Sequence, residues 1–279
     1  MNSHRLTGLL MLAMACPAVA QTITEPGMLL DDEAYEQLPY QEVLSKEKLR
    51  VRISYEPFCP AVQAQGAYST CVGFACGYYF RTIIEAKTRR ITDKTVINQL
   101  AFSPSYLYEK AKIDGDYACT QGVYLPKALD VLRGTGAVPV KSFPYPACSQ
   151  KTEAFDVVAA RYRISAYERL FSVRDEDRKK IENLRKALSG GSPVVIGMVI
   201  PASFYSAGRV WKPTPDENPQ DPQLRGHALC LIGYDDKRYG GSFRVVNSFG
   251  DAWGDHGFCW IRYRDLARFT RYGYALSQP

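Results

Sequence analysis

A change in the hydrophobic pattern near residue 190 constrains the fold of this 279-residue chain more than any other feature. Before it, apolar residues recur at helical spacing, which predicts helices over residues 71–86, 103–112, 125–133 and 176–188. After it, short β-rich runs between Gly and Asp turns predict strands over 193–200, 227–234, 243–247 and 257–263. Helices and strands that are separated along the chain predict an α+β fold of two lobes with a cleft between them. We interpret the proline-rich segment 209–226 as a loop on the rim of that cleft.

The first twenty residues have the pattern of an export signal. His4 and Arg5 precede an apolar run that ends in Ala18-Val19-Ala20, which is typical of a secretory signal peptide. We therefore expect a secreted or periplasmic protein. Lipid attachment at Cys16 is a competing interpretation that we disfavour, because apolar residues continue beyond it. No later segment approaches the roughly 20 apolar residues that a membrane-spanning helix needs, so none is predicted.

The remainder of the chain is interpreted as a short polar leader or arm (21–50) followed by one large domain (51–279). The formal net charge of +6 is spread along the chain, and few basic runs are longer than Arg178-Lys179-Lys180. A dispersed charge of this kind predicts no nucleic-acid surface. Nothing in the sequence implies an obligate partner.

The cysteine count suggests disulfides rather than a metal site. Of eight cysteines, Cys16 would leave with the signal, and seven in an oxidising compartment predict one free thiol and up to three bridges. If Cys71 is the free thiol, the candidates for pairing are Cys59, Cys76, Cys119, Cys148, Cys230 and Cys259. Zinc is the alternative, but the Cys-x-x-Cys spacing does not occur, so we expect no metal.

Four residues have the chemistry of a thiol hydrolase. Cys71 opens a predicted helix, whose dipole and free amides would favour the reactive thiolate. Gln65 could stabilise an oxyanion, while His227 and Asn247 in separate strand-like runs could act as the base and as the group that orients it. A lone cysteine in an apolar helix is usually a buried hydrophobe, but the other three residues reverse that expectation. His256 lies in a Gly-Asp-His-Gly turn and is interpreted as a surface residue.

From about residue 51 to the C-terminus the chain resembles papain-like cysteine peptidases. Residues 65–72 resemble the family's Gln-Gly-x-Cys-Gly-Ser-Cys-Trp block, residues 226–228 its His strand, and residues 247–254 its Asn-Ser-Trp-Gly-x-x-Trp-Gly block. Residues 119–122 and 143–145 are more weakly similar to its Cys-Asn-Gly-Gly and Tyr-Pro-Tyr segments. The resemblance implies a two-lobed fold, with a helical lobe (about 65–150) and an antiparallel β-sheet or barrel lobe (about 151–279).

The resemblance also implies a mechanism. Cys71 would attack a scissile carbonyl, His227 would protonate the leaving amine, and Asn247 would orient the imidazole. Gln65 and the Cys71 amide would stabilise the oxyanion, and Gly122 would bind substrate. Peptides or proteins are the implied substrates, and no cofactor is needed. Because residues 21–50 lack the long helices of an inhibitory propeptide, we expect activity without removal of a large N-terminal piece.

Several positions depart from the family pattern. Tyr68 replaces a half-cystine, so we expect Cys119 and Cys148 to pair with each other or with Cys59 or Cys76. Two tryptophans of the family are also replaced, by Val72 and Phe249. Two other functions remain open: a catalytically silent binding or scaffold protein of the same fold, and a cell-wall peptide amidase or acyl transferase.

Overall fold

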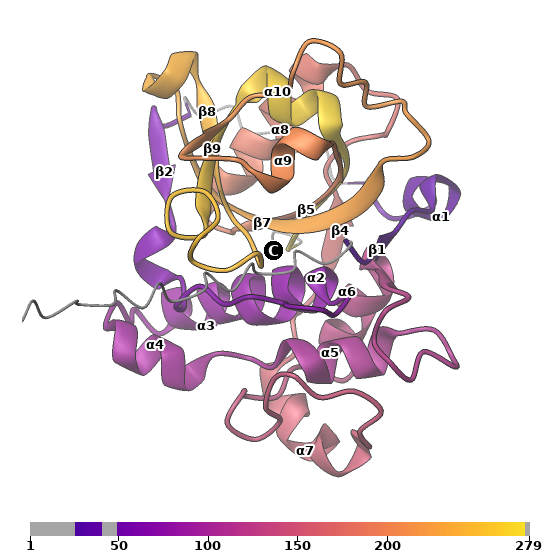
Figure 1. Cartoon of the computed structure of the whole chain (residues 1–279). Helices are drawn as coiled ribbons and strands as arrows, with labels where there is room; N and C mark the ends of the chain where they lie inside the picture. Colours follow the sequence, from indigo (N-terminus) through magenta and orange to yellow (C-terminus); the bar gives the residue numbers. More distant parts are fainter. Residues whose placement is uncertain (1–25, 41–48, 277–279) are drawn as a thin grey trace, which may run out of the picture.

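A computed structural model describes residues 26–40 and 49–276 of the chain. The predicted signal peptide (1–20) lies outside these residues, as does part of the predicted arm. Figure 1 shows two lobes, one built of helices and the other of a sheet with helices against it. The α+β prediction is confirmed.

The central helix of the helical lobe begins at Cys71, as predicted. It runs through α2 (Cys71–Gly73), a π-helical stretch η2 (Phe74–Arg81) and α3 (Thr82–Thr88). Every residue over 71–83 is buried, because the helix contacts α5 and α6 on one side and strand β7 of the sheet on the other. A helix that is apolar around its whole circumference is expected in such a position.

The other helices of this lobe surround the central one. Ser103 caps α5 by accepting a hydrogen bond from the Tyr106 amide, and Pro104 occupies the first turn, as the sequence predicts. The predicted helices 103–112 and 125–133 correspond to α5 (Pro104–Ala111) and α6 (Leu125–Gly134). Further helices are α4 (Lys94–Leu100), α7 (Asp156–Ala159), η1 (Glu56–Phe58), η3 (Glu153–Phe155) and η4 (Ala160–Tyr162).

The sheet has the strand order β4-β10-β5-β7-β8-β9-β6, and most neighbouring strands are antiparallel. Its strands are β4 (Tyr167–Arg169), β5 (Val194–Ile200), β6 (Val210–Trp211), β7 (Arg225–Asp235), β8 (Ser242–Val246), β9 (Phe258–Arg262) and β10 (Thr270–Leu276). The ends of this order, β4 and β6, do not pair among the described residues, so the sheet is open rather than a barrel. The four predicted strands correspond to β5, β7, β8 and β9, while β10 was not predicted.

Two short strands join the sheet from outside the β lobe. β2 (Arg52–Ser54) pairs with β7, and β1 (Met28–Leu29) pairs with β7 at Gly226 and with β3 (Val123–Tyr124) of the helical lobe. β1 therefore bridges the two lobes. This bridge was not predicted, because two-residue strands carry no periodicity.

Helices also occur in the second half of the chain. The predicted helix 176–188 is α8 (Asp177–Ser189), which packs with α10 (Tyr263–Phe269) against β5. The segment 209–226 is not wholly a loop, since β6 pairs with β9 inside it and β7 begins at Arg225. The remaining helices are α1 (Asp32–Glu36), α9 (Ala202–Tyr205) and η5 (Arg238–Gly240).

Candidate active site

Cys71 lies at the start of the central helix, where the helical lobe faces strand β7. Its side chain is fully buried. The start of its helix contacts strand β7, and the backbone at Ala228 and Gly27 is near enough to the sulfur to lower the pKa of the thiol against the effect of burial. Cys71 therefore lies beside the strand that carries His227, although the two are 156 residues apart in the sequence.

His227 and Asn247 are joined by a short hydrogen bond between neighbouring strands. His227 Nε2 lies 2.7 Å from Asn247 Oδ1, and Asn247 follows the last residue of β8. Because the amide oxygen only accepts, Nε2 carries the proton and Nδ1 is left as the acceptor. Nδ1 is buried without a hydrogen-bond partner. This tautomer is the one that can take a proton from a thiol.

Aromatic rings shield this pair from water. The Phe249 ring lies 4.6 Å from the imidazole, measured between centroids, and Phe204 lies 6.2 Å from it. Asn247 is further held by the Tyr79 hydroxyl, which donates to its backbone oxygen at 2.9 Å. Phe249 thus covers the His–Asn contact, where the family has tryptophan.

Gln65 is held by groups from both lobes. The backbone N–H of Gln65 donates to the Ser248 backbone oxygen at 2.8 Å, and the Ser248 hydroxyl donates to the side-chain Oε1 of Gln65 at 2.7 Å. Its Nε2 donates to the Tyr68 oxygen at 2.7 Å, and its carbonyl accepts from the Tyr145 hydroxyl at 2.5 Å. One Nε2 hydrogen remains for a further acceptor. Ser248 was not predicted as a site residue, although it lies in the block 247–254 that carries the family resemblance.

Gly122 lies where a peptide backbone approaches closely. It has φ +88°, and a Cβ there would lie 2.2 Å from the Gly27 oxygen. Its amide donates to the Tyr108 hydroxyl, which in turn donates to Asp116 at 2.5 Å. The position accepts only glycine, because its φ is positive and because a Cβ would collide with the Gly27 oxygen.

The segment Pro26, Gly27, Met28, Leu29 and Leu30, here called the arm strand, crosses the cleft between Gly122 and Gly226. The Val123 amide donates to the Gly27 oxygen at 2.8 Å, and a Cβ at Gly27 would lie 2.0 Å from the Ser69 oxygen. A strand within the predicted arm therefore occupies the cleft, which the sequence analysis did not predict. The apolar triplet at 28–30, inside an otherwise polar leader, is the signal that could have indicated it.

A short helix anchors the arm strand to the β lobe. Tyr35 of α1 is fully buried, and its hydroxyl donates to the Phe171 oxygen at 2.8 Å. Asp32 forms an ion pair with Arg271 and accepts from the Tyr272 hydroxyl at 2.7 Å. The helix α1 that carries these two side chains has five residues. A second ion pair joins Glu36 to Arg169 at 3.3 Å, so the arm is held by one buried side chain and two partly buried charge pairs.

Burial determines the charge of the site. It raises the pKa of the Cys71 thiol to about 11, although the amides of Ala228 and Gly27 partly offset this. It also lowers the pKa of His227 to about 4, against a smaller opposing effect of the Asn247 hydrogen bond. Both groups are therefore neutral at pH 7 in the covered site. The thiolate expected from the helix dipole is not favoured in this state.

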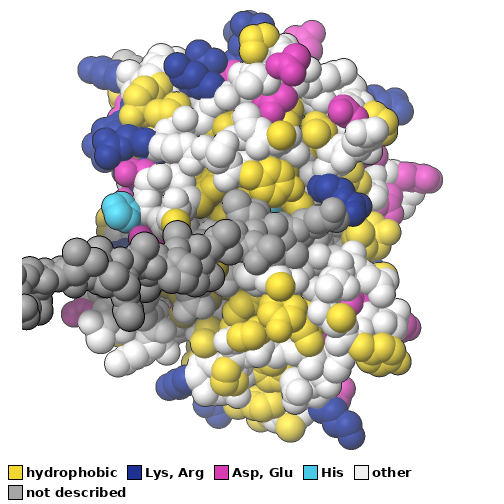
Figure 2. All heavy atoms as spheres, in the orientation of Figure 1, with side chains coloured by type: hydrophobic (Ala, Val, Ile, Leu, Met, Phe, Trp, Pro, Cys, Tyr) yellow, Lys and Arg dark blue, Asp and Glu magenta, His cyan; other side chains and the backbone are white. Residues whose placement is uncertain are grey.

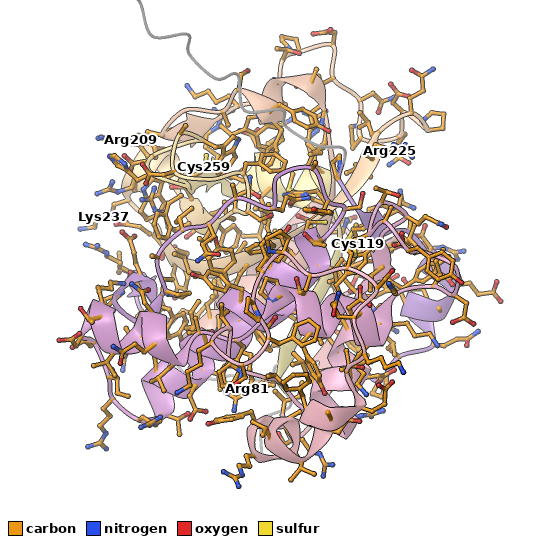
Figure 3. All side chains as sticks on the ribbon, turned by 60° about the horizontal axis from the view of Figure 1, so that its bottom comes forward. Arg81, Cys119, Arg209, Arg225, Lys237 and Cys259 are labelled. Atoms are coloured by element: carbon orange, nitrogen blue, oxygen red, sulfur yellow. A yellow bond between two sulfur atoms is a disulfide. The ribbon has the colours of Figure 1, made fainter. Side chains whose placement is uncertain are left out.

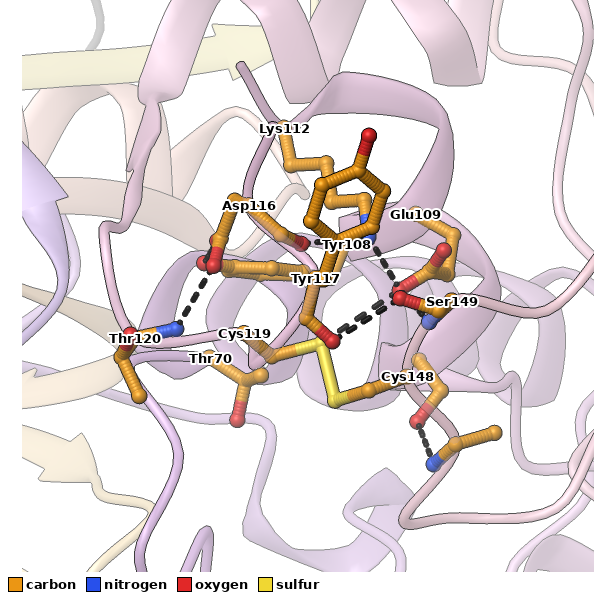
Figure 4. The surroundings of a disulfide bond; sticks show 12 residues. Thr70, Tyr108, Glu109, Lys112, Asp116, Tyr117, Cys119, Thr120, Cys148 and Ser149 are labelled. Carbon is orange, nitrogen blue, oxygen red and sulfur yellow. Dashed lines mark hydrogen bonds and ion pairs between the residues drawn. A yellow bond between two sulfur atoms is a disulfide. The ribbon is translucent and has the colours of Figure 1, made fainter. Parts of the chain in front are cut away.

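The disulfide of the described residues joins Cys119 to Cys148 in the helical lobe (Figure 4). Of the pairings left open for these two cysteines, with each other or with Cys59 or Cys76, the structure has the first. Five described cysteines are free and buried: Cys59, Cys71, Cys76, Cys230 and Cys259. The expectation of a single free thiol is wrong, because these side chains fill apolar core positions. Figure 3 shows Cys119 and Cys259 in different lobes.

Among the described residues, Glu109, Cys119 and Cys148 form a group of potential metal-ligand type. Both sulfurs belong to the disulfide and offer no thiolate, so we assign no metal to it.

His256 is exposed and faces Asp251 at 3.3 Å, as expected of a surface turn. On the face shown in Figure 2, Lys and Arg side chains are dispersed among acidic and neutral ones. No helix in the part of the chain that the structure describes could cross a membrane.

The fold has a cysteine-protease architecture, and the sequence comparison agrees. The family model described as papain family cysteine protease matches residues 55–271. The chain belongs to this family.

Curated relatives are distant. An uncharacterized peptidase C1-like protein of Acanthamoeba polyphaga mimivirus is 25% identical over 218 residues, which cover 73% of this chain and 64% of that protein. A cathepsin L-like peptidase of Aedes aegypti is 28% identical over 209 residues, which cover 71% of this chain and 53% of the relative. The matches thus span less than two thirds of either relative.

Solved structures confirm the fold. Xylellain, a cysteine protease from Xylella fastidiosa, is 22% identical with a TM-score of 0.73, and the match covers 95% of this chain and 100% of that one. Digestive procathepsin L 3 of Tenebrio molitor is 18% identical with a TM-score of 0.68, covering 86% of this chain and 73% of that one.

Proposed function

We propose that this protein is an exported cysteine peptidase that hydrolyses peptide bonds through Cys71, His227, Asn247 and Gln65. The observation that carries the proposal is the 2.7 Å bond from His227 Nε2 to Asn247, which leaves Nδ1 free as a base on the strand that contacts the helix start at Cys71. Residues 1–20 would be the signal peptide and residues 51–279 the peptidase domain.

The chemistry follows from these positions. The Cys71 proton passes to His227 Nδ1 and the sulfur attacks the scissile carbonyl carbon, forming a C–S bond. The oxyanion accepts hydrogen bonds from the Gln65 side-chain amide and the Cys71 N–H. The C–N bond then breaks as His227 gives its proton to the leaving amine. Water, deprotonated by the same imidazole, cleaves the thioester and restores the thiol.

The arm strand must leave the cleft before a substrate can enter, because its backbone lies against Gly122, Ser69 and the Cys71 sulfur. Its departure would rehydrate Cys71 and His227. Rehydration would return the pKa of each group toward its ordinary value, which favours the reactive ion pair. The covered site is thus a resting state.

The test is labelling of the full exported chain with a peptidyl epoxide, mapped by mass spectrometry, together with turnover of fluorogenic peptides. Gly27→Ala displaces the arm strand without cutting the chain, since its Cβ would collide with the Ser69 oxygen. We expect it to accelerate both readouts by at least about tenfold relative to the unaltered chain. Gly134→Ala is the matched control, because that position has open space around it.

The outcomes separate the functions. Labelling of Cys71 that His227→Ala abolishes, together with peptide turnover, supports the peptidase. Labelling with turnover of cell-wall fragments alone would instead indicate the amidase. An unreactive Cys71 in the Gly27→Ala protein would contradict both and leave a binding protein.

A further inference from the structure

Tyr145 connects the two elements that carry Gln65 and Cys71, although it lies more than 70 residues from either. Its hydroxyl donates to the Gln65 backbone oxygen at 2.5 Å and lies 2.9 Å from Thr70 Oγ1. Because the Tyr145 proton is given to the carbonyl, Thr70 must donate to Tyr145. Thr70 directly precedes Cys71 at the N-cap of α2.

The Tyr145 ring is itself fixed against the central helix. It packs edge-to-face on Phe74 at 4.8 Å and on Tyr68 at 6.2 Å, measured between centroids. Three residues further on, Cys148 is tied to Cys119 by the disulfide (Figure 4). Burial also raises the pKa of Tyr145 well above its ordinary value, so the hydroxyl remains a donor at any working pH.

Gln65 needs such a support on the helical side. On the side of the β lobe, Ser248 holds the backbone N–H and the side-chain Oε1 of Gln65. The next residue, Gly66, has φ +59°, and a Cβ added there would have no atom within 4 Å. The Gln65 carbonyl belongs to the peptide that enters this open turn. On the helical side Nε2 also donates to the Tyr68 oxygen at 2.7 Å, but the bond from Tyr145 is the one that holds the carbonyl of this peptide.

We propose that Tyr145 is a positioning residue for the oxyanion-stabilising amide of Gln65. The inference rests on the proposed peptidase function and assigns a role to a side chain that does not touch the reacting atoms. Loss of the hydroxyl lets the Gln65 peptide rotate, and Nε2 then misses the oxyanion. Because that charge exists only in the transition state, the loss falls on kcat and not on KM.

The experiment is a double-mutant cycle with Tyr145→Phe and Gln65→Ala, both in the Gly27→Ala full chain, with enzyme concentration set by Cys71 titration. Tyr145→Phe should lower kcat about tenfold with KM unchanged within about twofold. In the Gln65→Ala background the same substitution should change kcat by less than about twofold. Tyr55→Phe is the matched control, since it also removes a 2.5 Å bond from a buried hydroxyl to a backbone oxygen, that of Leu188.

An equal loss of kcat in both backgrounds, or a rise of KM alone, would overturn the role of Tyr145. Thr70→Val tests whether the Tyr145 hydroxyl acts through the start of α2 instead of through Gln65. If Thr70→Val lowers kcat as much as Tyr145→Phe does, the hydroxyl acts through α2. Binding of a peptide aldehyde gives an independent readout, because its hemithioacetal oxygen occupies the same oxyanion position. A Cys71 that binds the aldehyde but hydrolyses no peptide would refute the peptidase function, while the cycle measured on aldehyde affinity would still decide the role of Tyr145.

Discussion

The two sides of the active site are held together in different ways. His227 and Asn247 lie on β7 and at the end of β8, neighbouring strands whose backbone hydrogen bonds set their separation. Cys71 and Gln65 lie instead at a helix start and at a turn, which one backbone hydrogen bond to Ser248 and single side chains such as Ser248 and Tyr145 hold in place. Many backbone hydrogen bonds fix the register of a sheet together, so the loss of one side chain leaves the register in place. A turn that individual hydrogen bonds hold has no such reserve. The helical side should therefore be the more sensitive to substitution of supporting residues.

The largest effect is expected from the reacting groups themselves, one on each side. In the Gly27→Ala protein, Cys71→Ala or His227→Ala should lower kcat/KM by about 10⁴-fold or more, because no other group can supply the nucleophile or the base. Active-site-titrated kinetics with a fluorogenic peptide measures this. Residual activity above about one per cent in either variant would assign the chemistry to another residue.

Loss of the disulfide tests the support of the helical side. Replacing both Cys119 and Cys148 by Ser opens a loop with a sequence separation of 29 residues, and should lower the free energy of unfolding by about 3.5 kcal/mol. Denaturant unfolding with and without reductant checks it. The double variant must be insensitive to reductant; a further loss on reduction would reveal another bridge.

The strand side offers a smaller, purely catalytic effect. Asn247→Ala removes the bond that orients the imidazole and should lower kcat by about 10²-fold. The fold should survive, because β8 ends at Val246 and its pairing with β7 and β9 does not use the Asn247 side chain. Circular dichroism and thermal melting serve as the control. A large fall in Tm would contradict the view that strand pairing holds this side of the site without the Asn247 side chain.

The pH dependence of stability should report the buried imidazole. The folded-state pKa of His227 is about 4, below its ordinary 6.5, so the unfolded chain takes up a proton first as the pH falls. Stability from this group is present above pH 6.5 and is lost between pH 6.5 and 4, amounting to about 2 kcal/mol between pH 7 and 5. Denaturant titrations of wild type and His227→Gln should differ by this amount. Parallel pH profiles would show that His227 is not buried in solution.

The site residues could be predicted from the sequence because short motifs encode them. Cys71 at a helix start, Gln65 six residues before it, and His227 and Asn247 in strand-like runs are local patterns, and the structure places each on the predicted type of element except that Asn247 follows its strand. The helices at 103–112 and 125–133 are equally local, since caps and periodicity lie within one segment.

Only the tertiary structure decided how these pieces are covered and supported. The two-residue pairing of β1, the contact of the Tyr145 hydroxyl with Gln65, and the choice of Cys148 as the partner of Cys119 all join segments far apart in sequence. The neutral state of Cys71 and His227 is also a consequence of burial, which a sequence does not display. Chemical identity is a local property of the chain, whereas desolvation and support depend on which distant surfaces meet.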